Sequence, residues 1–437
     1  MERSSLKEIT VGKHLLKTTD TNSMNAIYNT AILAYSKLVK TAALWNRKAR
    51  LMTEGQAKTM QTIRTKFKPD DHPVWIHAAS LGEFEQGRPI IERIRSRFPD
   101  RKILLTFFSP SGYEVRKEYA MVDAVCYLPF DTEENAEEFI GTLQPSLAIF
   151  VKYEFWGNYL EALSEHAVPT MIVSAIFRRS QLFFRPYGSM FRRMLRCFTA
   201  GIYVQDADSK ALLSTIGIDS IVAGDTRFDR VTDIMATTKN FPSIAEFASD
   251  GMVMVAGSSW PRDEELIIDY FNRHPRMKLI IAPHEFDDAR VDALRKKIAR
   301  PSVRYSRLYD GEKIDGDCLI LDCFGILSSC YRYGSIAYVG GGFGVGIHNI
   351  NEAAVYGIPV IFGPNYKKFK EARDLVGRGG AFSVSKAADY EAVLDHLIAN
   401  EDARIAAGDV CGEYIRENLG ASDRIFNDIA QILASAK

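Results

Sequence analysis

Short runs of aliphatic, β-branched and aromatic residues alternate with longer segments of helical period from Val74 onward. Buried parallel strands read as continuous apolar runs, and the helices that join them read as amphipathic segments, so this alternation predicts βα units. A break at residues 237–247, TTKNFPSIAEF, divides the runs into two series of similar size. The pattern predicts an α/β protein with two Rossmann-like domains facing each other across a cleft, where ligands lie at the carboxyl ends of the strands.

The individual strands can be placed within each series. In the first series they are predicted at residues 74–77, 103–108, 124–128, 147–151, 170–173, 202–204 and 221–223. In the second they are predicted at 252–256, 279–282, 303–305, 318–321, 336–339, 360–362 and 382–384. Helices are expected between them, as at 85–98 and 136–143, and a last helix at 421–436 is expected to pack back on the first domain. The predicted domains are therefore 51–236 and 248–420.

The N-terminal residues follow a different pattern. Residues 1–23 are polar and unpatterned, which predicts a disordered extension, and residues 24–50 predict a helix. Lys37 and Lys40 interrupt its apolar run, which is therefore shorter than the roughly 20 residues that a spanning helix needs. Its basic, tryptophan-bearing end favours a helix that lies on a membrane surface, and a soluble helix packed on the first domain is the alternative. Its apolar positions are Ile27, Ile32, Leu33, Leu38, Leu44 and Trp45.

Composition excludes several classes of protein. The 437 residues carry 55 basic and 55 acidic side chains, so no overall charge points to nucleic acid. Six cysteines without a C-x-x-C pair suit reduced thiols in a cytosolic compartment, and eight histidines form no H-x-x-x-H pair. We therefore expect neither a protein-bound metal nor another cofactor.

A glycine-rich segment at residues 335–364 is the most informative stretch of the second domain. A strand ends in three glycines, Gly340 to Gly342, and a helix is expected to begin near His348 or Asn349. Glycines let backbone N–H groups approach an anion, so this loop is a candidate phosphate site. Ile347 occupies the third required glycine position, so the dinucleotide fingerprint is absent.

Polar residues near this loop are candidates for the rest of a nucleotide. Glu352, with Asn349 before it, could accept the hydroxyls of a ribose, or it could only complement the helix dipole. Gly325, in the loop LDCFGILSS, would let the backbone reach a flat base, although a simple turn is as good an interpretation. His284 follows another strand and either donates to a phosphate or is structural.

The turn after the first strand, HAASLGEFEQGRP, carries Ser80, Gly82 and Glu83. A glutamate here would face the predicted cleft and could take a proton from an attacking hydroxyl, an effect worth about 10²–10⁴-fold in rate. The alternative is that Glu83 caps the helix together with Ser80. Glu154, after the fourth strand, would also point to the cleft, either to orient substrate or to pair with Lys152 or an arginine.

Arginines and aromatic residues are interleaved at 178–196, RRSQLFFRPYGSMFRRMLR. Guanidinium groups bind phosphate, and aromatic rings suit acyl chains or headgroups, so the segment favours a phosphorylated amphiphile or an anionic bilayer. A solvated basic helix is the alternative. Its arginines are Arg178, Arg179, Arg185, Arg192, Arg193 and Arg196.

Together these stretches resemble the 3-deoxy-D-manno-octulosonic acid (Kdo) transferases of lipopolysaccharide synthesis, glycosyltransferase family 30. The motifs that carry the resemblance are HAASLGEFEQGRPII, LLTFFSPSGYEV, YLPFD and GGGFGVGIHNINEAAVYGIPVIFGP, and it extends over the chain from about residue 24. It implies a GT-B enzyme without an active-site metal that moves Kdo from CMP-Kdo to the lipid A precursor, lipid IVA. It also implies a place on the cytoplasmic face of the inner membrane.

The resemblance implies a role for each candidate residue. Glu83 matches the family's catalytic base, which acts with inversion, and Asn349 and Glu352 match its nucleotide-binding residues. Support for the acceptor or the transition state is assigned to Ser80, Gly82, Glu154, Arg178 and Arg185. The donor-binding set comprises Ser258, Ser259, His284, Phe324, Gly325, Ile326, Gly341, Gly342, Asn349 and Glu352.

This chain departs from the family pattern at several positions. Lys152 stands in place of an acid, Trp260 in place of a histidine and Ile326 in place of a glutamate, and APHEF keeps only His284 of an Arg-His-Pro run. These changes bear on the donor contacts. Arg227 and Arg88 are candidates for the cation that meets the donor's carboxylate.

Two other functions compete with Kdo transfer. One is a GT-B enzyme for another nucleotide sugar, either a UDP-sugar transferase or a UDP-sugar 2-epimerase, because the missing dinucleotide fingerprint does not exclude these. The other is a non-enzymatic membrane-surface scaffold.

Overall fold

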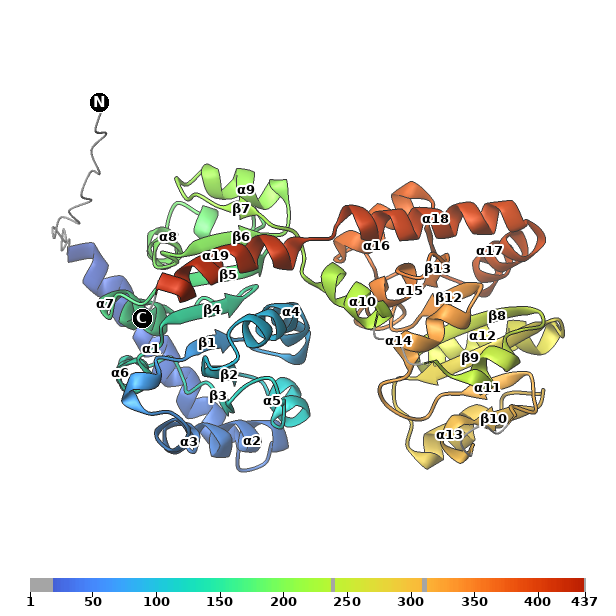
Figure 1. Cartoon of the computed structure of the whole chain (residues 1–437), viewed down its shortest axis with the longest axis horizontal. Coiled ribbons are helices and arrows are strands. Elements are labelled where there is room, and N and C mark those ends of the chain that lie inside the picture. The colour runs from blue at the N-terminus through green and yellow to red at the C-terminus, as the bar shows by residue number, and fades with distance from the viewer. Residues whose placement is uncertain (1–18, 237–239, 309–312, 436–437) are drawn as a thin grey trace. The chain divides into compact units, whose positions relative to one another are not determined.

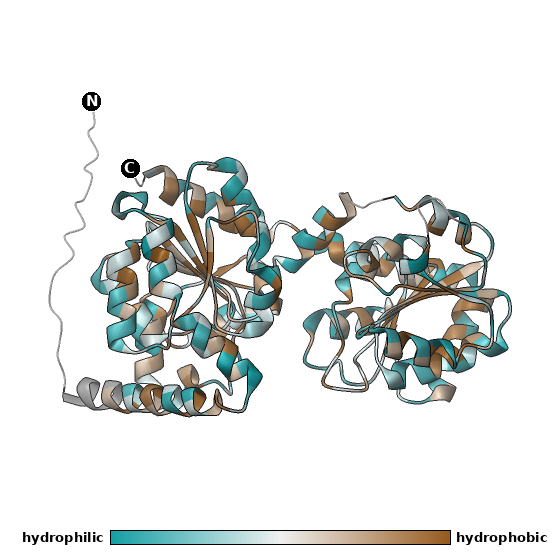
Figure 2. Cartoon of the chain, turned by 90° about the horizontal axis from the view of Figure 1, so that it is seen from below, coloured by the Kyte–Doolittle hydropathy of each residue, from teal (hydrophilic) through white to brown (hydrophobic). Residues whose placement is uncertain are grey.

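The structure is a computed structural model that describes residues 19–236, 240–308 and 313–435. The chain forms two compact units, Met1–Ala223 with Ile425–Lys437, and Gly224–Arg424 (Figure 1). Most of the predicted extension at residues 1–23 lies outside the described residues. In both units the apolar strands lie inside and the helices that cover them carry polar residues outward (Figure 2). The predicted α/β fold class is confirmed.

Unit 1 is built on a parallel sheet of seven strands in the order β3-β2-β1-β4-β5-β6-β7. All seven predicted strands are present, with ends that differ by at most two residues. They are β1 Val74–His77, β2 Ile103–Phe107, β3 Ala124–Tyr127, β4 Leu147–Val151, β5 Thr170–Ala175, β6 Gly201–Val204 and β7 Ile221–Val222. The helices are α1 Thr19–Ala42, α2 Arg47–Gln56, α3 Thr59–Lys66, α4 Leu81–Arg97, α5 Pro110–Arg116, α6 Glu133–Leu143, α7 Gly157–Glu165, α8 Ser189–Arg196, α9 Ala207–Ser214 and α19 Ala421–Ser435, with 3-10 turns η1 Pro69–Asp71 and η2 Leu182–Phe184.

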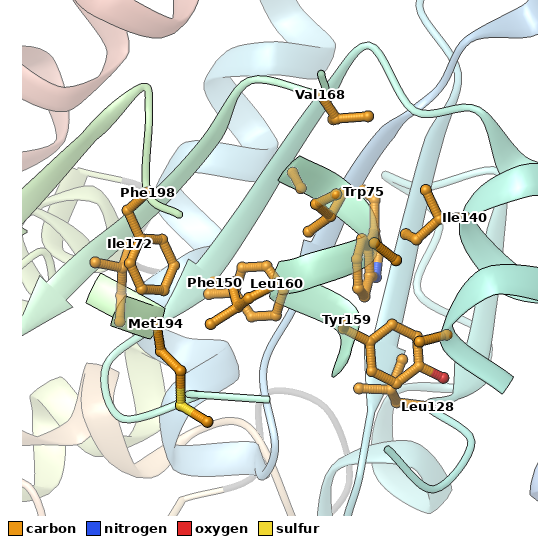
Figure 3. Close-up of a cluster of buried hydrophobic side chains, with 14 of the residues drawn as sticks. Trp75, Leu128, Ile140, Phe150, Tyr159, Leu160, Val168, Ile172, Met194 and Phe198 are labelled. Atoms are coloured by element: carbon orange, nitrogen blue, oxygen red, sulfur yellow. The ribbon is translucent and has the colours of Figure 1, made fainter. Parts of the chain in front are cut away.

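The core of unit 1 explains why these strands are continuous apolar runs. The residues of β1, β2 and β4 are buried on both faces of the sheet. Trp75 packs against Phe150 and Tyr159 on one face (Figure 3), and its indole N–H donates to the Thr106 hydroxyl at 2.8 Å. The one polar atom of this large buried side chain is thereby satisfied, as burial requires.

Unit 2 repeats the architecture with a second parallel sheet of seven strands, in the order β10-β11-β9-β8-β12-β13-β14. Its strands are β8 Met252–Ser259, β9 Met277–Pro283, β10 Ser302–Arg304, β11 Cys318–Ile320, β12 Ile336–Val339, β13 Val360–Phe362 and β14 Ala381–Ser383. The helices are α10 Arg227–Ala236, α11 Pro242–Phe247, α12 Pro261–Arg273, α13 Asp288–Arg295, α14 Leu327–Cys330, α15 Asn351–Ala354, α16 Lys370–Arg378, α17 Ala387–Ala399 and α18 Glu401–Glu417, with 3-10 turns η3 Tyr305–Arg307 and η4 Tyr331–Tyr333.

The boundary between the units falls at Ala223 and Gly224, before the predicted linker at 237–247. The reason is α10, whose Phe228 and Val231 belong to the core of unit 2. Helix α11, inside the predicted linker, adds Ile244 and Phe247 to the same core. Burial of apolar side chains away from water is favourable, and the apolar face of α10 is buried in the core of unit 2. The helix therefore belongs to unit 2.

The last helix, α19, joins unit 1. Its Ile425, Ile429 and Leu433 belong to the core cluster that contains β1 and β2, and the Tyr203 hydroxyl donates to Asp428 at 2.5 Å. The chain therefore returns from unit 2 to cover the sheet of unit 1.

The N-terminal segment forms two helices where one was predicted. Asn46 ends the run because its side-chain oxygen accepts from the N–H groups of Lys48 and Ala49 and caps α2. A polar contact holds α1 against the rest of unit 1. The Tyr28 hydroxyl donates to the buried Asp131, which also accepts from the backbone N–H of Tyr159 at 2.9 Å. Within the described residues, neither α1 nor any other helix is long and apolar enough to cross a bilayer.

Candidate functional site

Glu83 lies in the first turn of α4, which begins at Leu81, four residues before the predicted start. Its Oε2 accepts from the backbone N–H and the hydroxyl of Ser80, both at 2.9 Å. This capping box satisfies N–H groups that would otherwise be free, which is why the helix starts early. A carboxylate offers about four lone-pair sites, so capping leaves capacity to accept a proton. Gly82, in the same turn, is exposed.

The surroundings of Glu83 favour its neutral form. Burial raises the pKa of Glu83 above its usual value, and the nearby carboxylate of Glu154 raises it further. The hydrogen bond from Ser80 and the charges of Lys152 and His77 lower the pKa, but by less than the first two causes raise it. A carboxylate with a raised pKa is a stronger base near neutral pH, which is the property that proton abstraction needs.

Glu154 is itself held by a buried network that sequence analysis missed. His77 is fully buried, with Nδ1 2.9 Å from the Thr106 hydroxyl and Nε2 3.3 Å from Glu154 Oε2. The indole N–H of Trp156 donates to the same oxygen at 2.6 Å. The indole N–H of Trp156 also lies 3.1 Å from His77 Nε2, so His77, Glu154 and Trp156 form one cluster of polar contacts. The feature of the sequence that could have indicated this network is His77, a histidine at the end of an otherwise apolar strand.

Strained backbone marks the carboxyl ends of three strands. Lys152, Ser174 and Ser258 have positive φ angles of 71°, 53° and 53°, although none of them is glycine. Such conformations cost about 1–3 kcal/mol each and gather at functional sites. Lys152 follows β4 directly and its charge acts on Glu83, so this departure from the family pattern lies beside the candidate base.

The basic segment contributes less apolar surface than the sequence indicated. Phe183 is buried in the core of unit 1 against Phe155 and Phe177, and Phe184 and Phe191 pack on the same cluster. These rings therefore serve the core. Arg178 and Arg185 remain exposed, as does Tyr187.

In unit 2 the glycine loop after β12 is packed as tightly as its sequence suggests. Gly341 has a φ of 90°, and a Cβ there would lie 2.6 Å from the Gly346 carbonyl oxygen. A Cβ on Gly342 would lie 2.6 Å from the backbone of Gly363. Side chains at these positions are therefore excluded, and backbone alone forms the loop.

The helix after this loop differs from the prediction. Helix α15 begins at Asn351, later than expected, and has four residues, so its dipole contributes little to anion binding. Asn349 precedes it and donates through Nδ2 to Glu352 Oε1 at 3.1 Å. The two predicted ribose-binding residues are thus in contact.

The other predicted donor-binding residues differ in accessibility. Ser259 is buried and donates to Glu264, which forms an ion pair with Arg290 at 2.5 Å. The Ser259 hydroxyl therefore already has a hydrogen-bond partner in the protein interior. Ser258 is half-buried and His284 is exposed.

The loop after β11 is open. Phe324 is 88% exposed and packs edge-on against Phe286, with ring centroids 4.6 Å apart. Gly325 has a φ of 85°, and a Cβ added to it would meet nothing within 4 Å, whereas Ile326 packs on the core of unit 2. Accessible backbone and an exposed ring suit a planar ligand group.

Neither arginine named for the donor's carboxylate is available as a lone cation. Arg227 is bound by Asp225 at 2.6 Å and Glu371 at 3.2 Å. Arg88 pairs with Glu92 at 2.7 Å. The structure therefore favours neither candidate.

Comparison with solved structures extends the fold assignment. UDP-GlcNAc 2-epimerase from Neisseria meningitidis, bound to UDP-GlcNAc, superposes with a TM-score of 0.57 at 13% identity, over 82% of this chain and 100% of that one. MurG from Acinetobacter baumannii gives 0.54 at 10% identity, over 82% and 99%. At such identities the likeness shows the fold alone, and the fold is of the GT-B type.

Sequence comparison gives the relatives. Residues 46–230 match the family model described as 3-deoxy-D-manno-octulosonic-acid transferase (kdotransferase). The 3-deoxy-D-manno-octulosonic acid transferase of Aquifex aeolicus is 28% identical, over 75% of this chain and 86% of its own length. That of Haemophilus influenzae is 26% identical, over 82% and 87%. The resemblance indicated by the motifs is confirmed, and the chain is a glycosyltransferase related to the Kdo transferases.

Proposed function

We propose that the chain transfers Kdo from CMP-Kdo to a lipid A-type acceptor, lipid IVA, in lipopolysaccharide synthesis. The observation that carries the proposal is the carboxylate of Glu83, held by Ser80 and with its pKa raised by burial and by Glu154. The identity of the transferred sugar is inferred from the name that the relatives share.

In the proposed reaction Glu83 accepts the proton of a sugar hydroxyl on the lipid. The hydroxyl oxygen attacks the anomeric carbon of Kdo, the bond from that carbon to the phosphate oxygen breaks, and CMP leaves with its electron pair. Attack opposite the leaving group inverts the anomeric centre. A general base of this kind contributes about 10²–10⁴-fold to the rate. Glu154 supports the step through its charge, and Ser80 and Gly82 shape the turn.

Unit 2 is proposed to bind the donor. The glycine loop around Gly341 and Gly342 takes the phosphate through backbone N–H groups other than that of Gly341, which donates to Asp263. Asn349 and Glu352 take the ribose, and the open loop around Phe324 takes the cytosine. Ser258 and His284 remain candidates for direct contact, whereas Ser259, which is bonded to Glu264, positions the strand end.

The acceptor is proposed to approach from a membrane surface. Ile27, Ala31, Ala34 and Leu38 are all exposed and recur at helical spacing on α1, so they form one apolar stripe. Leu44 and Trp45, in the turn after α1, are 75% and 71% exposed. An apolar stripe left in water beside basic residues favours the interfacial helix over a helix packed by this face. Arg178 and Arg185 would meet the phosphates of the lipid.

Incubation of the purified chain with lipid IVA and CMP-Kdo generated in situ tests the proposal. Mass spectrometry of the lipid should show a gain of one Kdo or of successive Kdo units. An unchanged lipid, with intact donor and a known transferase active in parallel, would contradict it. Thermal-shift ranking of CMP, UMP and UDP covers the alternative, since tighter UDP binding would favour an enzyme for a UDP-sugar.

A further inference from the structure

Three rings from three different loops form a stack at one edge of the sheet of unit 2. Trp260 follows β8, His284 follows β9 and His348 ends the glycine loop after β12. The centroids of Trp260 and His284 are 4.6 Å apart with ring planes at 25°, and those of His284 and His348 are 4.6 Å apart at 32°. The indole N–H of Trp260 donates to His348 Nε2 at 3.2 Å. Because these strands are parallel and adjacent, their carboxyl ends bring the rings together.

The stack is anchored to the same residue as the glycine loop. Asp263, which is fully buried, accepts from the backbone N–H of Trp260 at 2.9 Å and from that of Gly341 at 3.0 Å. Its other oxygen accepts from the Tyr338 hydroxyl at 2.8 Å. The backbone N–H of His348 donates to the Gly340 carbonyl at 3.1 Å. The indole ring and the candidate phosphate seat are therefore held in a fixed relation, as a preorganised ligand site requires.

The contact between Trp260 and His348 also defines the charge of the His348 ring. Since Nε2 of His348 accepts the indole hydrogen, its proton lies on Nδ1 and the ring is neutral. Burial and the neighbouring His284 lower the pKa of His348, in agreement with this tautomer. The His348 ring therefore does not act as a counter-ion for phosphate. Its open surface is provided by Trp260, which is 37% exposed, and by His284.

The helices that follow the stack and the helices that follow the nucleoside positions pack on opposite faces of the sheet, although the Phe324 ring itself contacts Phe286 in the loop after β9. The loop of Phe324 and Gly325 leads into α14, and Glu352 lies on α15; Cys330 and Ala353 of these helices share one core cluster. Trp260 and His284 lead into α12 and α13, whose Ile267 and Val291 belong to the cluster on the other face. In a nucleotide sugar the phosphate joins the nucleoside to the sugar. With the ribose at Asn349 and Glu352 and the phosphate on the glycine loop, we expect the sugar to extend toward Trp260.

We propose that Trp260 is a specificity-determining residue that receives the sugar of the donor against its exposed indole face, with His284 and His348 holding the ring in place. The inference rests on the proposed function and adds the residue that distinguishes a nucleotide sugar from the free nucleotide. The C–H face of a sugar ring gains contact with the indole and loses contact with water, an interaction that a bare nucleotide cannot make.

Binding of CMP and of freshly generated CMP-Kdo to the full chain tests the proposal. Trp260→Leu should raise the Kd of CMP-Kdo by about five- to tenfold and leave that of CMP within about twofold. Trp260 is the only one of the four tryptophans in the sequence of unit 2, so fluorescence gives a direct readout. CMP-Kdo should change the emission of the wild type more than CMP does, and Trp260→Phe should abolish that extra change.

Ile405→Ala, an exposed apolar position on α18, is the matched control and should leave both Kd values unchanged. Thermal unfolding of each variant shows whether the fold is kept. If Trp260→Leu fails to fold, Trp260→Phe, which keeps an aromatic ring, is used in its place. Provided that the wild type binds CMP-Kdo, the inference would be overturned if Trp260→Leu weakened the binding of CMP and CMP-Kdo equally, or weakened the binding of neither. Failure of the wild type to bind either compound, or a preference for UDP, would overturn the proposed function and this inference with it.

Discussion

His77 Nε2 lies 3.3 Å from Oε2 of Glu154; His77 is the last residue of β1 and Glu154 follows β4, and these two strands pair directly in parallel. The contact fixes a second carboxylate near Glu83, where it raises the pKa of the candidate base. The strength of that base is thus set by residues on a neighbouring strand as well as by its own helix.

Replacing Glu154 should change the pH dependence of transfer. The base works when deprotonated, so kcat/KM falls as the pH falls through the pKa of Glu83. Glu154→Gln removes the like charge, lowers that pKa, and should move the acid limb of the pH profile to lower pH. The plateau rate should fall as well, because a base with a lower pKa is weaker. The amide oxygen can still accept from Trp156. The measurement is kcat/KM from about pH 4 to pH 9.

The control is Glu165→Gln, an exposed carboxylate at the end of α7. Its acid limb should match that of the wild type. An acid limb that stays in place in Glu154→Gln would show that Glu154 does not act on the base.

Glu83→Gln should abolish transfer and keep the fold. Glutamine also completes a capping box with Ser80, so the melting temperature should change little. Turnover should fall by about 10²–10⁴-fold, the usual contribution of a general base. Single-turnover transfer and CMP binding measured on the same sample separate chemistry from donor affinity.

Glu85→Gln is the matched control for Glu83. It changes a carboxylate in the same helix that pairs with Arg116 at 2.9 Å. It should retain activity. Substantial turnover by Glu83→Gln would remove Glu83 from the role of base.

Gly341→Ala should damage the donor site. The residue has a φ of 90°, and a Cβ would lie 2.6 Å from a backbone oxygen, so the loop must shift. Strain of this kind costs about 1–3 kcal/mol, and CMP binding should weaken by about tenfold or more. Calorimetric titration with CMP measures the effect.

Gly377→Ala provides the comparison for Gly341. Gly377 lies in α16, and its added Cβ would meet nothing within 4 Å. Alanine should stabilise the helix by about 0.5–1 kcal/mol and leave CMP affinity unchanged. If both variants bound CMP equally well, the glycine loop would not be the phosphate site.

The stability of the folded chain should fall with rising pH because of the buried Asp131, which lies between α1 and α7. Burial raises the pKa of Asp131 from 3.8 to about 7, although hydrogen bonds from Tyr28 and from the backbone of Tyr159 oppose the rise. The folded chain therefore holds a proton that the unfolded chain releases near 3.8, and the stability this confers is lost as the pH rises through about 7. Asp131→Asn carries no titrating proton, so it should show a smaller fall in melting temperature between about pH 5 and pH 8. Parallel falls in both proteins would contradict this.

The exposed stripe of α1 should mediate membrane binding. Leu38 is 69% exposed, and burying a leucine in a bilayer interface gains about 1.5–3 kcal/mol. Leu38→Asp should therefore reduce sedimentation with anionic vesicles by about tenfold or more. Ile405→Asp, on α18 of unit 2, should have no effect. Unchanged binding of Leu38→Asp would reject α1 as the contact surface.

Most of the fold follows from the chain's local pattern. Strands such as Leu147–Val151 and Ile336–Val339 are buried on both faces, so their sequences are uninterrupted apolar runs, unlike those of amphipathic surface helices. Glycines at positions such as Gly341 can be recognised because only glycine adopts the backbone angles that the loop needs. The candidate base could also be predicted, because its helix start follows a strand and carries an acid at the capping position.

The amino-acid pattern alone is therefore enough to define the strands, the α/β fold and the residues at the carboxyl ends of strands, whereas it missed the division of the N-terminal segment into two helices and helix α11. Which of these residues meet depends on the assembled sheets. Strand order brings His77 to Glu154 across β1 and β4, and Trp260 to His284 and His348 across β8, β9 and β12. Packing also turns Ser259 inward and closes Arg227 between two carboxylates. Hydrophobic period reports which side of an element is buried, whereas pairing between strands far apart in sequence depends on packing of the whole sheet.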